Sequence, residues 1–220
     1  YRQYQTALTD DCAFLARYLV RPVEVRDARG KTVVATVHGD EGIHKTTAEG
    51  LAALRPVASG GTVTFGTQTH PADGNAGVVL VNSRERARAL SGTAKPDVQL
   101  VSYGQARVKK GFMPMAVAPA ARLAMERAGI GVGELTSVTT HNPFAVNDVY
   151  LSRTLGIDPE MMNRHGCSLV WGHPQGPTGM RSIIELIEDL AVQGGGYGLF
   201  TGCAAGDSAA AVVVRVSGRS

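Results

Sequence analysis

The sequence predicts an α/β protein in which helices cover both faces of a sheet. Glycine is abundant, at 27 of 220 residues, and aromatic residues make up only 5%. This composition is typical of chains with tight turns and close helix–sheet contacts. In the second half, segments with strand and helix patterns alternate, and residues 209–216 are almost all Ala and Val, as expected of a strand buried on both faces.

The second half has the clearer pattern. We predict strands at residues 98–103, 135–140, 198–201 and 209–216, and helices at 119–128, 144–155 and 178–192. Gly129 and Gly156 are expected to end the first two helices. The last two strands should be antiparallel neighbours, because their connection is too short for a crossover.

The first half is harder to interpret. Helical spacing predicts an amphipathic helix over residues 1–20, followed by a strand pair at 23–25 and 32–37. Thr46 and Glu49 fit a capping box that starts a short helix. Further predicted elements are strands at 62–65 and 76–81 and a helix at 84–90. The change of pattern predicts two units, residues 1–95 and 96–220.

Charge and cysteine content exclude several classes of protein. The net charge is +3, and the basic residues form no stripe that would bind nucleic acid. No apolar run is long enough for a membrane span. Cys12, Cys167 and Cys203 lack the spacing of a disulfide framework or a metal site. We therefore expect a cytoplasmic protein with reduced cysteines and no bound metal.

Three motifs contain residues suited to catalysis. Residues 172–179 (Gly-His-Pro-Gln-Gly-Pro-Thr-Gly) precede the longest amphipathic helix, where His173 could activate a thiol or bind an oxyanion. Cys203 lies in a tight Gly-Cys-Ala-Ala-Gly turn between the last two strands. His141 and Asn142 follow a predicted strand, at a position that favours sites in α/β sheets.

Each motif also has a purely structural interpretation. His173 could simply cap a helix, and Cys203 could be a small buried side chain. His141 or Asn142 could cap the helix that follows them. Met115, in a proline-bounded loop, is a further candidate for substrate contact.

The three motifs, in this order, resemble the thiolase superfamily. Gly172-His173-Pro174 resembles its histidine motif, Gly202-Cys203 its second-cysteine motif, and residues 141–144 its Asn-Glu-Ala-Phe block. Residues 46–56, 61–74 and 115–119 resemble other segments of the family. The resemblance implies the layered α-β-α-β-α thiolase architecture, with the carboxy-terminal core domain at 96–220. Residues 1–95 then correspond to the end of the loop and amino-terminal domains.

The resemblance also implies a division of labour. In this family a nucleophilic cysteine takes up the acyl group of an acyl-CoA, and the histidine matching His173 activates that cysteine. The cysteine matching Cys203 moves the proton at the carbon whose C–C bond is made or broken. The residue matching His141 orders a water or donates directly in one oxyanion hole, and the amide near Ala205 contributes to the other.

Further implied substrate contacts are Asn142, Met115, Gly172 and Thr69, which matches a serine near the pantetheine arm. Coenzyme A is then a co-substrate, and no tightly bound cofactor is implied.

Departures from the family pattern indicate an atypical substrate. His141-Asn142-Pro143 replaces Asn-Glu-Ala, Ala205 replaces a glycine, and Ala116 and Ala118 replace two more. An aromatic substrate such as benzoylsuccinyl-CoA is one expectation.

The nucleophilic cysteine motif of the family has no match here. We therefore expect a processed, split or truncated chain whose nucleophile comes from an amino-terminal half or a separate subunit. The family also implies homo- or hetero-oligomers, and for atypical members a zinc-ribbon/OB-fold partner.

Two other functions stay open. One is a condensing enzyme related to ketoacyl synthases or hydroxymethylglutaryl-CoA synthase, using His141 and His173 as its two histidines. The other is a non-catalytic, acyl-CoA-binding subunit.

Overall fold

The centre of the molecule is a four-stranded mixed sheet. The computed structural model describes residues 1–92 and 95–218. The strand order is β3-β6-β5-β4, and the strands are β3 (Asp97–Arg107), β4 (Leu135–His141), β5 (Gly196–Ala204) and β6 (Ser208–Ser217). β6 is antiparallel to both its neighbours, whereas β4 and β5 are parallel. The expected antiparallel arrangement of the last two strands is confirmed.

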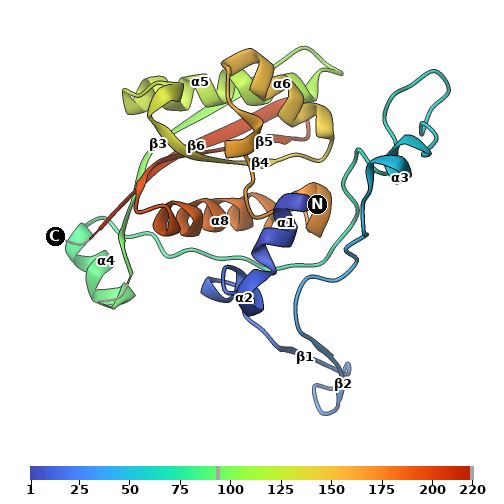
Figure 1. Ribbon diagram of the computed structural model, residues 1–220. Helices are drawn as coiled ribbons and strands as arrows, with labels where there is room; N and C mark the ends of the chain where they lie inside the picture. Colours follow the sequence, from blue (N-terminus) through green and yellow to red (C-terminus); the bar gives the residue numbers. More distant parts are fainter. Residues whose placement is uncertain (93–94, 219–220) are drawn as a thin grey trace.

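Helices cover both faces of this sheet (Figure 1). On one face lie α5 (Val117–Ala128) and α6 (Ala145–Leu155), and on the other α8 (Thr178–Val192). The predicted α/β class is confirmed, and within the described residues the layers are three, α/β/α. Gly129 and Gly156 end α5 and α6 in the left-handed conformation, with φ of 70° and 71°.

Small residues bring the layers close together. α5 presents buried alanines to β3, and a Cβ on Gly104 of β3 would collide with the backbone of Ala120. On the other face, Leu186 and Leu190 of α8 pack against Phe200 and Val214. The high glycine and alanine content therefore sets the spacing of helix and sheet.

The predicted helix over residues 1–20 is wrong as a single element. The segment divides into α1 (Arg2–Ala7), α2 (Thr9–Cys12) and a 3₁₀ turn, η1 (Leu15–Arg17). Residues 10–12 have positive φ, between 50° and 58°. Contacts on either side of this break hold the chain to different places: Tyr4 donates to Asp40, and Tyr18 donates to Glu185 of α8.

Other elements of the first half are partly as predicted. The hairpin of β1 (Val23–Arg26) and β2 (Val33–Val37) and helix α4 (Arg84–Ser91) confirm the sequence patterns. α3 (Ala48–Ala52) begins one residue later than expected. Its cap is Thr47, whose Oγ1 accepts from the Gly50 amide at 3.0 Å, so the Thr46–Glu49 capping box is wrong.

The strands predicted at 62–65 and 76–81 do not form. Among the described residues neither segment has a neighbouring strand in a ladder, and a strand needs such a partner for its backbone groups. Val79 and Leu80 are 80% and 71% exposed, although the sequence pattern suggested burial.

The remaining short elements connect the layers. They are η2 (Met113–Ala116), η3 (Val132–Glu134), η4 (Pro159–Met161) and α7 (Ser168–Trp171). In the part of the chain that the structure describes, no helix has the length and apolar character of a bilayer span. Residues 93 and 94, directly before the predicted boundary at 95, lie outside the described residues, and that boundary stays a prediction.

Candidate active site

Strand pairing places two of the three motifs side by side. His141 is the last residue of β4, and in the parallel register its partner on β5 is Gly202, the residue before Cys203. A Cβ on Gly202 would lie 2.8 Å from Cβ of His141, so glycine is required for this close approach. His141 and Cys203 therefore lie at the carboxyl edge of two neighbouring parallel strands, where sites in α/β sheets are expected.

His173 joins this edge from the segment between α7 and α8. Its imidazole ring lies 4.3 Å from that of His141, centroid to centroid, with a tilt of 32°. Nδ1 of His173 is 2.8 Å from Oγ1 of Thr178, the first residue of α8. Gly172 has a φ of 91°, and a Cβ there would lie 2.7 Å from Cβ of Ala72.

Burial keeps both histidines neutral near pH 7. Desolvation, and to a lesser extent the neighbouring His173, lowers the pKa of His141 to about 4. Desolvation also lowers the pKa of His173. Because burial disfavours protonation of both rings, both are available as bases at neutral pH.

Cys203 is almost completely buried, with 6% of its surface exposed. Burial raises the pKa of its thiol, while a hydrogen bond from Asn147 Nδ2 to Sγ, 3.3 Å long, acts in the opposite direction. Asn147 Oδ1 is buried and has no hydrogen-bond partner among the described residues. Sequence reasoning missed Asn147, although an asparagine inside a helix directly after the His141 motif was a signal.

Ser168 connects the remaining predicted residues. Its hydroxyl contacts His141 Nδ1 at 3.1 Å and Asn142 Oδ1 at 2.9 Å. Its carbonyl accepts from Thr69 Oγ1 at 2.5 Å. The Thr69 amide also donates to the Pro143 carbonyl at 2.8 Å, so the segment at 67–71 lies directly against the site. The sequence analysis assigned no role to Ser168.

Met115 and Ala205 are less closely connected to the histidines. Met115 borders a separate hollow of about 220 Å³ formed with Val108, Lys109 and Phe112. Ala205 is exposed in the turn after β5, where its carbonyl accepts from Ser208. Their proposed substrate contacts stay predictions.

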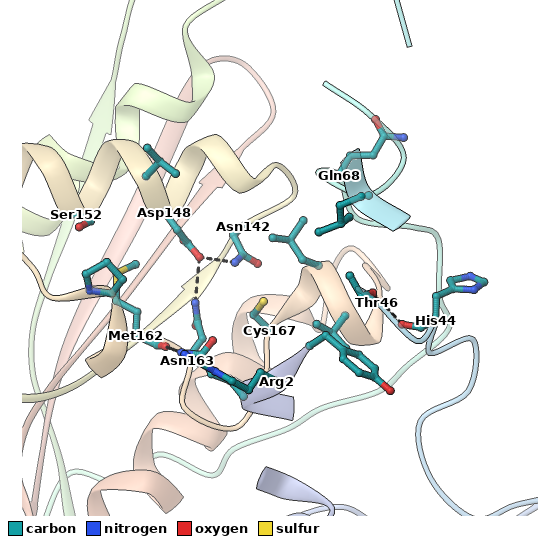
Figure 2. A pocket seen from close by; sticks show the side chains of 18 of the residues that line it. Arg2, His44, Thr46, Gln68, Asn142, Asp148, Ser152, Met162, Asn163 and Cys167 are labelled. Carbon is teal, nitrogen blue, oxygen red and sulfur yellow. Dashed lines mark hydrogen bonds between the residues drawn. The ribbon is translucent and has the colours of Figure 1, made fainter. Parts of the chain in front are cut away.

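A cavity of about 600 Å³ lies next to the Asn142 end of this site (Figure 2). Its lining includes Asn142, Asp148, Asn163 and Cys167, but not His141, His173 or Cys203. Asn142 and Asn163 both donate to the Asp148 carboxylate at its edge. Cys167 is half-buried here, and desolvation raises the pKa of its thiol to about 11.

The comparisons with known proteins identify the family of the chain. The family model for the thiolase carboxy-terminal domain matches residues 94–216, and the model for the thiolase amino-terminal domain matches residues 14–84. The chain is 34% identical to beta-ketothiolase BktB of Cupriavidus necator over 189 residues, which is 84% of this chain and 47% of that protein. It is 35% identical to a probable acetyl-CoA acetyltransferase of Mycobacterium leprae over 198 residues, 89% of this chain and 49% of the relative.

Solved structures show the same relationship. Human mitochondrial 3-ketoacyl-CoA thiolase superposes with a TM-score of 0.80 at 26% identity, covering 98% of this chain and 52% of the human chain. His141, His173 and Cys203 thus lie at one edge of the sheet in a chain with the thiolase fold. The chain belongs to the thiolase family, and it spans about half the length of the curated relatives that it matches.

Proposed function

We propose that this chain supplies the histidine–cysteine part of a thiolase-type acyl-CoA C-acyltransferase site. The observation that carries the proposal is the close contact of the His173 and His141 rings at the strand edge that also holds Cys203. Acid–base chemistry on a thioester needs a neutral base and a second proton carrier, and these residues supply both.

In the thiolytic direction, His173 accepts the proton of a nucleophilic thiol. The thiolate attacks the 3-oxo carbon of the substrate, and the C–C bond next to that carbon breaks. Cys203 donates its proton to the carbon that leaves as a new acyl-CoA. Coenzyme A then gives its thiol proton to the Cys203 thiolate, and its sulfur takes the acyl group from the enzyme. The thiolate that leaves the acyl group takes back the proton held by His173, which restores the nucleophilic thiol.

The nucleophilic thiol in this proposal comes from a segment outside the chain. Cys12 lies at the end of α2, beside the small cluster of Ala7, Phe14 and Leu15. The thiol of Cys167 has a strongly raised pKa, the opposite of what a nucleophile requires. An amino-terminal thiolase half or a separate subunit is the partner we propose, within a homo- or hetero-oligomer that could include a zinc-ribbon/OB-fold protein.

The proposed substrate is an atypical 3-oxoacyl-CoA, with an aromatic compound such as benzoylsuccinyl-CoA as the specific candidate. The support is the exchange of the usual Asn-Glu-Ala for His141-Asn142-Pro143 at the site. Ala116 and Ala118 do not support it, because both are fully buried in the core. Comparing thiolysis of acetoacetyl-CoA with that of an aromatic 3-oxoacyl-CoA tests this part of the proposal.

The reaction itself is tested in the enzyme reconstituted with its partner. Cys203→Ala and His173→Gln should each lower kcat for thiolysis about 10²- to 10⁴-fold, the usual contribution of a positioned acid or base. Cys12→Ala, remote from the strand edge, is the matched control and should retain activity. Near-normal thiolysis by Cys203→Ala would contradict the assignment.

A decarboxylative condensing enzyme is the second candidate, since it would use the paired histidines without a second cysteine. It predicts release of CO₂ from a malonyl thioester and insensitivity to Cys203→Ala. A non-catalytic subunit predicts acyl-CoA binding without an acyl-enzyme, which intact mass measurement of the reconstituted complex would distinguish.

A further inference from the structure

The hydroxyl of Ser168 has more partners than protons. Ser168 is fully buried, and three groups surround Oγ. They are the backbone nitrogen of Asn142 at 3.2 Å, the side-chain Oδ1 of Asn142 at 2.9 Å and His141 Nδ1 at 3.1 Å. A backbone N–H can only donate, so it uses one lone pair of the hydroxyl. The single hydroxyl proton must then go either to Asn142 Oδ1 or to His141 Nδ1.

Asp148 decides between these two acceptors. Its carboxylate accepts from Thr140 Oγ1 at 2.7 Å, from Asn163 Nδ2 at 3.1 Å and from Asn142 Nδ2. An ionised carboxylate only accepts, so the Asn142 amide must turn its NH₂ group toward Asp148 and Oδ1 toward Ser168 (the Asn142–Asp148 bond is drawn in Figure 2). Among the described residues, Ser168 is the donor that the structure gives to Asn142 Oδ1.

The proton of Ser168 therefore goes to Asn142, and the remaining lone pair of Oγ accepts from the imidazole. We propose that Ser168 is a positioning residue that holds His141 in the Nδ1–H tautomer and leaves its Nε2 as a hydrogen-bond acceptor. The opposite arrangement would leave the buried Asn142 Oδ1 without a donor. An unsatisfied buried acceptor is unfavourable enough to give a preference of about 5- to 100-fold.

The consequence for catalysis rests on the proposed function. A histidine whose Nε2 is unprotonated cannot donate directly to an oxyanion. It can accept a hydrogen bond from a water whose other proton points at the oxyanion. Of the two roles that the family resemblance leaves open for His141, the Ser168–Asn142–Asp148 network selects the water-holding one.

The tautomer is measured directly by two-bond ¹H–¹⁵N correlation spectra of the chain labelled with ¹⁵N-histidine. A pH of about 8 keeps Asp148, whose pKa burial raises to about 6, in its carboxylate form. The His141 signals are assigned by their loss in His141→Gln. In the wild type, Nδ1 should have the shift of a protonated nitrogen and Nε2 that of an unprotonated one.

Variants then test the cause. Ser168→Ala should raise the Nε2–H population of His141 at least fivefold, whereas Ser168→Thr keeps the hydroxyl and should retain the wild-type pattern. The control is Ser102→Ala, which removes a serine hydroxyl on β3 that donates to the Ala124 carbonyl. A dominant Nε2–H form in the wild type would overturn the proposal even if Ser168→Ala fails to fold. The spectra require no turnover, so failure of the proposed acyl transfer would not change the measured tautomer. Equally, an unexpected tautomer would not contradict the proposed acyl transfer.

Discussion

Gly202→Ala is the substitution for which the structure gives the sharpest expectation. The new Cβ would lie 2.8 Å from Cβ of His141 and 3.0 Å from Cζ of Phe200. The Phe200 ring can turn away slightly, but Cβ of His141 is attached directly to the β4 backbone. The ends of β4 and β5 would therefore have to separate by several tenths of an ångström.

The size of the effect follows from the overpacking of a well-packed interior. Inserting one methyl group without room costs typically about 1–3 kcal/mol of folding free energy. For a chain of this length, that corresponds to a fall in melting temperature of roughly 2–12 °C. The same separation displaces His141 from His173, so the chemical shifts of both rings should change.

Thermal unfolding and histidine NMR spectra of the variant measure the two effects. Gly176→Ala is the matched control, because it lies in the loop beside His173 and a Cβ there has nothing within 4 Å. It should stay within about 0.5 kcal/mol of the wild type. If Gly202→Ala melts with the control and leaves the imidazole signals unchanged, the close contact between β5 and His141 is not as described.

Two further predictions concern stability. The pKa of His141 is lowered from 6.5 to about 4 because the folded protein holds its ring in the neutral form. The contribution of the neutral ring to the free energy of unfolding is complete above pH 6.5 and is lost as the pH falls toward 4, a change of roughly 3 kcal/mol. Asp148 has a raised pKa, so its effect on the pH dependence of stability has the opposite sign. The measurement is therefore the difference in the free energy of unfolding by urea between wild type and His141→Gln across this pH range. A difference that does not change with pH would contradict the lowered pKa of His141. Asp40→Asn removes one of the two carboxylate partners of buried Arg181, the other being Glu185, and should cost about 1.5–3 kcal/mol. Glu24→Gln, in an exposed ion pair, should cost less than about 1 kcal/mol; equal effects in the same unfolding assay would argue against burial of the Asp40 pair.

The candidate site was only partly visible in the sequence. His173 and Cys203 could be chosen because glycines flank them at the ends of predicted elements, and His141 because it follows a strand. Ser168 and Asn147 could not be chosen in this way. Their partners lie 27 and 56 residues away along the chain, and only packing brings the groups within hydrogen-bond distance.

The errors in the first half have a related cause. Residues 76–81 have the apolar pattern of a buried strand, but a pattern specifies burial without supplying the neighbour that provides it. The break at residues 10–12 likewise follows from contacts with Asp40 and α8, which no local propensity encodes.

The sequence by itself determined the α/β class, the alternation of strands and helices after residue 96 and the glycine stops of α5 and α6. These depend on periodicity and on backbone freedom, which are local properties. Only the tertiary structure decided that β4 and β5 run parallel with His141 beside Gly202, and that the His173 ring contacts that of His141. Register and ring contact depend on how distant segments pack, and the tautomer that we propose for His141 depends on a hydrogen-bond network that exists only once they have packed.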